Sequence, residues 1–213
     1  MGQASSSGAS SVTAERWLRR SLWLVACTMV YNALEAVVAL WAGVVAGSIA
    51  LVGFGLDSVI ELAAASVVLW RIAIEARGEA SQRVTRAESL VRRFVGATFL
   101  ALAAYVLIQS AWALWAGDAP EESVIGLVLA VVSLVVMPLI AWGKLRAAEA
   151  IGSAALRAEA RETLACSYLS FCLLFGLAAN AAFGWWWADP LAALLMVPWL
   201  IREGLEGFEQ DDD

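Results

Sequence analysis

Long apolar runs dominate the chain, and six of them reach the length of a membrane-spanning helix. About 20 residues, each rising 1.5 Å along a helix, cross a hydrocarbon core of ~30 Å. We therefore expect helices over residues 22–42, 48–70, 94–116, 123–142, 156–180 and 185–201. Charged residues crowd the first turns of the fifth run, so a shorter buried helix starting near residue 163 is the alternative there. The pattern predicts an all-α membrane protein, with a bundle of six transmembrane helices across residues 16–204.

Composition supports the membrane interpretation. Hydrophobic residues make up 62% of the 213-residue chain and charged residues only 16%, far from the balance of an ordinary soluble domain. Residues 1–15, rich in Ser, Gly and Ala, are predicted to be a flexible tail, and residues 205–213 an acidic one. No basic residue precedes Arg16, so the start does not resemble a signal peptide and the first helix is expected to be retained. The net charge of -6 includes the acidic tail, and we expect no nucleic-acid partner.

The basic residues predict the orientation of the helices. All 14 fall on one side of the six-helix arrangement: Arg16, Arg19, Arg20, Arg71, Arg77, Arg83, Arg86, Arg92, Arg93, Lys144, Arg146, Arg157, Arg161 and Arg202. The opposite side holds only acids, namely Asp118, Glu121, Glu122 and Asp189. Because cytoplasmic loops are enriched in Lys and Arg, both termini are predicted to be cytoplasmic. We expect a multi-pass protein of a cell membrane, the inner membrane of a bacterium.

Two polar pairs interrupt the apolar runs, and the members of each pair are four residues apart. Asp57 and Glu61 lie in the second run, and Glu162 and Cys166 lie in the fifth. Residues at this spacing share one face of a helix. A carboxylate inside a bilayer costs at least roughly 2.5 to 3.5 kcal/mol, so such groups usually mark an ion path. A hydrogen-bonded contact between helices is the alternative for Asp57 and Glu61.

A weak internal repeat relates the two pairs. Gly47 precedes Asp57 by the same ten positions that separate Gly152 from Glu162, and a Ser follows each Gly. Biased composition is the alternative explanation. The two runs would cross in opposite directions, as in the inverted repeats of many transporters. Ten residues of helix advance ~15 Å, about half of the hydrocarbon core, so Asp57 and Glu162 are expected near the same midplane.

The four side chains have the chemistry of a metal site. Carboxylate oxygens and a thiolate bind Zn²⁺ in tetrahedral geometry, and carboxylates alone also accept Mn²⁺ or Fe²⁺. For Cys166 the alternative is a small core residue, because free cysteine is often buried. The chain has no histidine, which excludes catalysis by Ser-His or Cys-His pairs. All three cysteines lie inside predicted spans, so disulfides are not expected.

These residues resemble the transmembrane domain of the cation diffusion facilitator (cation efflux) family. The resemblance rests on four stretches, in chain order: Asn32 and Glu35 with Gly43 in the first span; Gly47-Ser48-x-Ala50-Leu51 before Asp57-Ser58-x-x-Glu61; Leu156-Arg157-Ala158-Glu159-Ala160-Arg161-Glu162-x-x-x-Cys166; and Trp187-Ala188-Asp189-Pro190. The run ending in Val68-Leu69-Trp70-Arg71 looks most like the transmembrane protein 163 branch. The family pairs are usually Asp/Asp or His/Asp, so Glu61, Glu162 and Cys166 depart from the pattern.

The resemblance implies export of a divalent metal in exchange for protons, usually by a homodimer. Zn²⁺ is the expected cargo, with Mn²⁺, Fe²⁺ or Cd²⁺ as alternatives, and no permanent cofactor is expected. Glu162 would be the proton-coupled ligand in place of the family histidine. Asn32 and Glu35 would support the ligands or lie on the cation's way in, although a plain polar contact between helices is the alternative. Only about a dozen residues follow the sixth span, so the family's cytoplasmic domain is expected to be missing.

Glu159 is expected to pair with Arg157 or Arg161, although it could instead attract cations at the cytoplasmic mouth. Two other classes of protein fit the sequence less well. The first is a membrane protein that binds metal without transporting it. The second is an intramembrane enzyme with Cys166 as nucleophile, which would need Glu162, one turn away on the same helix, as its base. That geometry is poor for proton abstraction, so we expect that the protein is not an enzyme.

Overall fold

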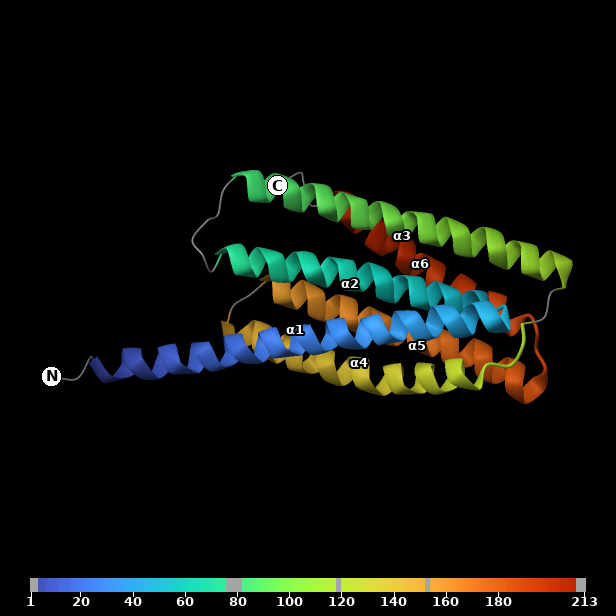
Figure 1. Cartoon of the computed structure of the whole chain (residues 1–213), viewed down its shortest axis with the longest axis horizontal. Helices are drawn as coiled ribbons and strands as arrows, with labels where there is room; N and C mark the ends of the chain where they lie inside the picture. Colours follow the sequence, from blue (N-terminus) through green and yellow to red (C-terminus); the bar gives the residue numbers. More distant parts are fainter. Residues whose placement is uncertain (1–3, 76–81, 118–119, 152–153, 210–213) are drawn as a thin grey trace.

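Six long helices make up the fold (Figure 1). The computed structural model describes residues 4–75, 82–117, 120–151 and 154–209. The helices are α1 (Ala4–Ala46), α2 (Ile49–Glu75), α3 (Gln82–Ala116), α4 (Val124–Ile151), α5 (Ala154–Phe183) and α6 (Ala188–Glu209). The described residues contain no strand, so the predicted all-α bundle is confirmed.

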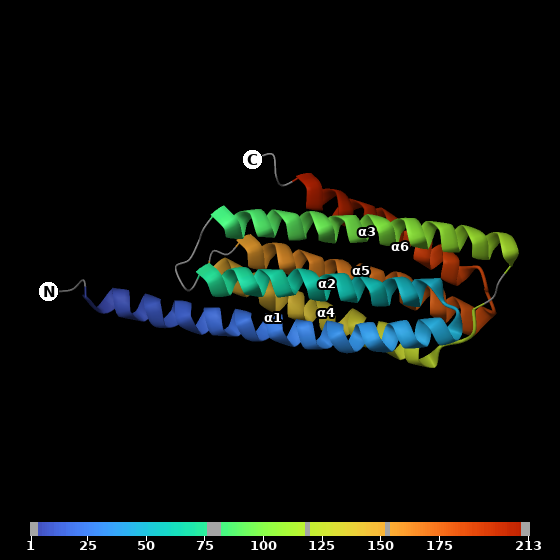
Figure 2. The ribbon, with the colours of Figure 1, turned by 45° about the horizontal axis from the view of Figure 1, so that its top comes forward.

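The helices form a four-helix group with a helix pair at its side. In the four-helix group α1 contacts α2 and α4, α5 contacts α4, and α2 contacts α5. The pair consists of α3 and α6, which pack closely on each other and reach the group through α2 and α5 (Figures 1 and 2). The start of α1 and the end of α6 lie at the same end of the bundle. Because α2 and α5 meet inside the group, their polar side chains can face each other.

Five of the described helices are long and apolar enough to cross a membrane. The candidate spans are Arg19–Ala46, Ile49–Val67, Arg93–Ala116, Val124–Ala150 and Glu159–Phe183. The sixth helix, α6, is not among these candidates by length and composition, because every 18-residue stretch of it holds at least three charged residues. Its apolar part is short, and the helix crosses the bundle packed against α3 and α5.

Helix ends differ more from expectation than helix positions do. The first helix begins at Ala4, so helix occupies most of the segment expected to be a flexible tail. The last helix continues to Glu209, into the predicted acidic tail, whose residues 210–213 lie outside the described part of the chain. The fifth helix begins at Ala154, so the alternative of a shorter helix from residue 163 is wrong.

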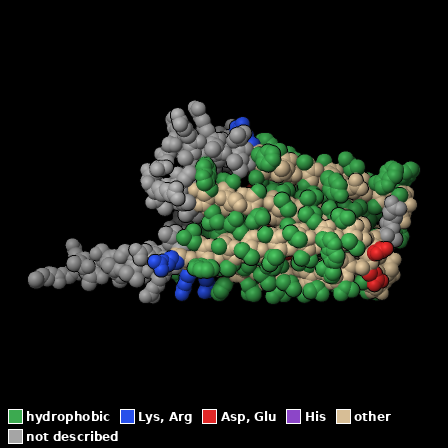
Figure 3. Space-filling view, viewed as in Figure 1, with side chains coloured by type: hydrophobic (Ala, Val, Ile, Leu, Met, Phe, Trp, Pro, Cys, Tyr) green, Lys and Arg blue, Asp and Glu red, His purple; other side chains and the backbone are tan. Residues whose placement is uncertain are grey.

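Charged side chains lie at the two ends of the bundle on the face drawn in Figure 3. On this face Lys and Arg gather at one end and acidic side chains at the other, with an apolar surface between them. We call the first the basic end; it carries the exposed Arg19, Arg20, Arg157, Arg161 and Arg202. Lys144 does not follow the rule, because it is fully buried inside the span of α4 rather than in a loop.

At the acidic end, a short turn and a capping contact fix the start of α2. Gly47 adopts a φ of 65°, a left-handed conformation that glycine accepts without strain. The buried Asp189 at the start of α6 accepts hydrogen bonds from the Ser48 hydroxyl and from the backbone amide of Ile49, the latter at 2.8 Å. Asp189 therefore satisfies free amides at the N-terminus of α2. The sequence placed Asp189 on the acidic side and in the family stretch of the sixth run, but it did not predict this capping contact.

Candidate metal centre

Three of the four predicted ligands come together between α2 and α5. The ligand atoms of Asp57, Glu61 and Cys166 all lie within 4.8 Å of one another. Their side chains are 3%, 9% and 0% exposed. We call these three residues the inner group. Two carboxylates and a thiol so close together, inside an apolar bundle, form a compact set of potential metal ligands.

Glu162 lies next to the inner group without joining it. It lines a narrow cavity of about 10 Å³, together with Asp57, Glu61, Ala64, Phe99, Ala165, Trp199 and Glu203. A space of this size holds about one water molecule. Residues four apart on a helix differ by about 6 Å in height, so Glu162 lies one turn closer to the basic end than Cys166. Glu162 thus borders the inner group on the side of the basic end.

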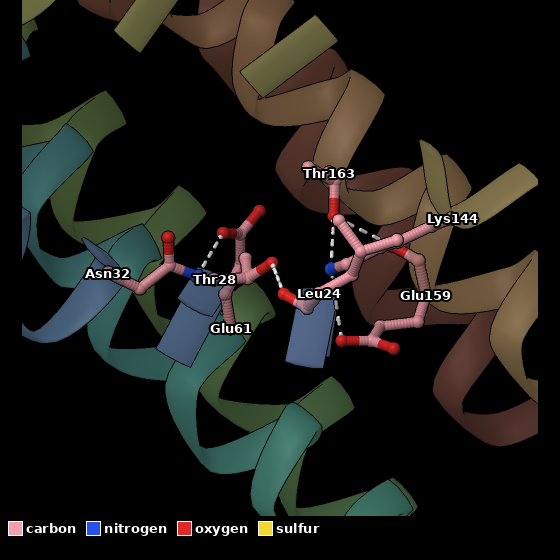
Figure 4. A network of polar contacts seen from close by, with 7 residues as sticks. All are labelled: Leu24, Thr28, Asn32, Glu61, Lys144, Glu159 and Thr163. Carbon is pink, nitrogen blue, oxygen red and sulfur yellow. Dashed lines mark hydrogen bonds and ion pairs between the residues drawn. The ribbon is translucent and has the colours of Figure 1, made fainter. Parts of the chain in front are cut away.

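The first helix supplies polar partners to the inner group. Asn32 donates a hydrogen bond of 2.8 Å from its side-chain amide to a carboxylate oxygen of Glu61 (Figure 4). The Ser58 hydroxyl donates to Glu35 at 2.9 Å, and the Cys166 thiol lies 3.9 Å from the same Glu35 oxygen. Asn32 and Glu35 therefore do make polar contacts between helices, and their partners are inner-group residues or neighbours of them. The sequence pattern named Ser58 only as part of the family stretch and did not predict its contact with Glu35.

Several buried oxygens at this level lack a partner. Among the described residues, Oδ2 of Asp57, Oε1 of Glu35 and Oδ1 of Asn32 accept no hydrogen bond. Buried polar atoms in proteins are nearly always paired, and an orphaned one asks for an explanation. Cation binding would give these oxygens the positive partner they lack.

A second polar cluster lies between α4 and α5. The Lys144 ammonium donates to Glu159 at 3.1 Å and to the Thr163 hydroxyl at 3.0 Å, and Thr163 donates to the Glu159 backbone carbonyl (Figure 4). The expected pairing of Glu159 with Arg157 or Arg161 is wrong, because both arginines point outward as exposed side chains. The buried carboxylate instead meets Lys144, a cation that α4 carries inside its span.

The sequence pattern of the cation efflux transmembrane domain matches residues 25–208 of this chain. The chain belongs to the cation efflux family. The matched range contains all six helices at least in part, together with the inner group. The family resemblance inferred from the sequence is thereby confirmed, and so is an integral, multi-pass membrane protein.

One curated relative of this cation efflux protein is an uncharacterized transporter of Synechocystis sp.. The two sequences are 29% identical over 154 residues, which make up 70% of this chain and 49% of the relative. The chain thus spans about half the length of that transporter.

Proposed function

We propose that this cation efflux protein transports a divalent transition-metal cation, zinc or a similar ion, out of the cytoplasm in exchange for protons. The observation that carries the proposal is the inner group, in which two carboxylates and a thiol from two helices lie within 4.8 Å of one another in the interior of the bundle. Ionisable groups within a membrane protein are expensive to bury and usually belong to a transport path.

The donor set favours a soft or borderline metal. Zn²⁺ binds thiolate at about 2.3 Å and carboxylate oxygen at about 2.0 to 2.2 Å, whereas Mg²⁺ takes oxygen ligands only. Three protein ligands leave one tetrahedral position for a water molecule or for Glu162. The group would then resemble an open site, from which an ion can leave, more than a closed structural one.

Proton exchange follows from the burial of the same groups. Burial disfavours the charged form of a carboxyl or thiol group, while metal binding requires the deprotonated form. Metal loading at the inner group would therefore release protons, and proton return would release the metal. We assign the coupling role to Glu162, because it lies one turn nearer the basic end, between the inner group and the predicted cytoplasmic side. Asn32 and Glu35 hold the ligands in place.

The matching spacing of α2 and α5 is compatible with alternating access. Each helix begins two residues after the glycine of the proposed repeat, at Ile49 and Ala154, and each places its first ligand eight residues later. Gly152 and Ser153 themselves lie outside the described residues. Helices related in this way can exchange roles when a site opens to one side and then to the other. Assembly as a homodimer is part of the proposal by family analogy alone.

Metal-dependent thermal stabilisation tests the site. A ligand that binds only the folded protein raises the melting temperature. We expect Zn²⁺ to stabilise the purified wild type and Glu121→Gln, which removes an exposed acid at the opposite end. Asp57→Asn, which keeps the shape of the side chain, should remove most of the shift, and Glu162→Gln should reduce it. Equal stabilisation of all four proteins would mean that these residues do not form the site.

A further inference from the structure

A groove opens between α3, α5 and α6 at the basic end. Its volume is about 480 Å³, and its charged lining residues are Arg161, Glu162, Arg202, Glu203 and Glu206. The rest of its wall is mostly apolar, from residues such as Val95, Phe99, Leu164 and Trp199. We call it the cytoplasmic groove. It has room for a hydrated cation, whereas the narrow cavity beside the inner group holds about one water molecule.

The cytoplasmic groove and the narrow cavity meet. Five residues line both: Phe99, Glu162, Ala165, Trp199 and Glu203. Glu162 and Glu203 are the two charged residues among them, one from α5 and one from α6. On the cavity side the lining also includes Glu61 and Asp57. Oδ2 of Asp57 is buried, in a residue only 3% exposed, and has no hydrogen-bond partner among the described residues.

The carboxylates of the groove are not equivalent. Glu206 is paired with Arg202 at 2.7 Å, one turn along α6. Glu203 makes no hydrogen bond or ion pair with any residue in the described part of the chain, and the same is true of Glu162. Two of the three acids are therefore available to a ligand, and they are the two at the junction with the cavity.

Close packing fixes the position of Glu203. Its neighbour Gly204 lies directly against α3, where a methyl group added at Gly96 would come within 2.7 Å of the Gly204 carbonyl oxygen. A methyl group added at Gly204 would lie 2.6 Å from Leu100. Since both contacts require glycine, the α6 backbone is held against α3 at this turn, next to Glu203, which lines the junction.

The junction differs from the inner group in its chemistry. It offers carboxylate oxygens, and Cys166 does not line either the groove or the cavity. Oxygen ligands accept Mg²⁺, Mn²⁺ and Zn²⁺ alike, whereas a thiolate favours Zn²⁺ and Cd²⁺. The junction and the inner group would thus select metal ions in two successive steps, first by charge and then by preference for sulfur.

We propose that Glu162 and Glu203 form an all-oxygen loading site, which takes a divalent cation from the cytoplasmic groove before the ion reaches Asp57, Glu61 and Cys166. This inference rests on the proposed transport function and extends the site to α6. The loading site admits divalent cations with little discrimination, and the inner group then retains the softer ones. Glu203 acts on capture of the ion rather than on its final coordination.

Metal uptake into proteoliposomes tests the loading site, because loss of that site should change KM and leave the maximal rate nearly the same. For Mn²⁺ and Zn²⁺ alike, Glu203→Gln should raise KM about tenfold, the scale of losing a supporting group of a metal site, with the maximal rate little changed. The matched control Glu206→Gln, one turn away and already paired, should leave KM within about twofold. Equal KM values for wild type, Glu203→Gln and Glu206→Gln would overturn the loading site.

Failure of the loading site can be distinguished from failure of the proposed transport function. Asp57→Asn should abolish uptake whether or not the loading site exists. Calorimetric titration with Mn²⁺ gives a second readout that does not need transport: weak binding should remain in folded Asp57→Asn and disappear in the Asp57→Asn/Glu203→Gln double variant. If Glu203→Gln does not fold, Glu203→Asp serves in its place and should raise KM less than tenfold. Residual Mn²⁺ binding unaffected by the loss of Glu203 would contradict the proposal.

Discussion

At the scale of single residues, some buried polar side chains hydrogen-bond with one another, and others keep atoms without a hydrogen-bond partner. In the cluster of Lys144, Glu159 and Thr163, the polar side-chain atoms bond to one another, except for one Glu159 oxygen without a partner among the described residues. Around the inner group, by contrast, Asp57 keeps an oxygen without a partner among the described residues. The unsatisfied atoms are concentrated where the proposed cation binds, which is how a site differs from a structural network.

Cys166 is the residue with the clearest consequence for metal choice. A serine has nearly the same size but offers a hard oxygen in place of a soft sulfur. We expect Cys166→Ser to weaken binding of Zn²⁺ and Cd²⁺ by roughly tenfold or more and to change Mn²⁺ binding little, because thiolate prefers softer metals. Competition calorimetry with the three metals measures this. A uniform loss for all three would point to a packing role for Cys166.

At the residue level, spacing predicted which side chains share a face of a helix. The four-residue step puts Asp57 and Glu61 on one face of α2, and the structure brings Cys166 of α5 to them. Their role as metal ligands stays a prediction. Spacing does not say which turn of α5 meets α2, so the offset of Glu162 toward the basic end needed the fold. Lys144 was missed because a lysine near the end of an apolar run is usually assigned to the loop, yet the helix continues past it to Ile151.

At the scale of elements, hydropathy predicts where helices lie but not where they stop. A helix can continue beyond the membrane into water, because its backbone hydrogen bonds do not depend on lipid. The first helix therefore starts at Ala4 and the third at Gln82, both well before their apolar runs. The sequence also did not indicate the contribution of α6. Glu203 lies just past the predicted end of the sixth span, and only the fold brings it to the cavity that Glu162 of α5 lines.

The buried Lys144–Glu159 pair joins α4 to α5 and makes a prediction about stability. Lys144→Met leaves the Glu159 carboxylate buried without its cation, which should cost about 3 to 5 kcal/mol of the free energy of unfolding. The double variant Lys144→Met/Glu159→Gln removes the stranded charge and should recover much of the loss. Thermal and denaturant unfolding in detergent measure both proteins.

The exposed pair on α6 is the control for this comparison. Arg202→Met breaks an ion pair whose side chains are 64% and 45% exposed, and it should change stability little. If Lys144→Met were as stable as the double variant, the Lys144–Glu159 contact would not be the link between α4 and α5.

At the scale of the whole molecule, the fold assembles the proposed path from parts that are far apart in sequence. The groove at the basic end is built by α3, α5 and α6, and the inner group by α2 and α5, with α1 behind it. The α5 helix takes part in every level. The basic end is the predicted cytoplasmic side, so the groove faces the compartment from which an exporter takes its cargo.

The central claim is that the inner group binds a metal in order to move it. Zinc uptake into proteoliposomes under an imposed pH gradient is the most direct test, with wild type, Glu121→Gln and Asp57→Asn compared at equal protein content. The account predicts uptake by the first two proteins that stops when the gradient is collapsed, and none by Asp57→Asn. Zinc binding by the wild type without any gradient-driven uptake would contradict it and identify a membrane metal-binding protein instead.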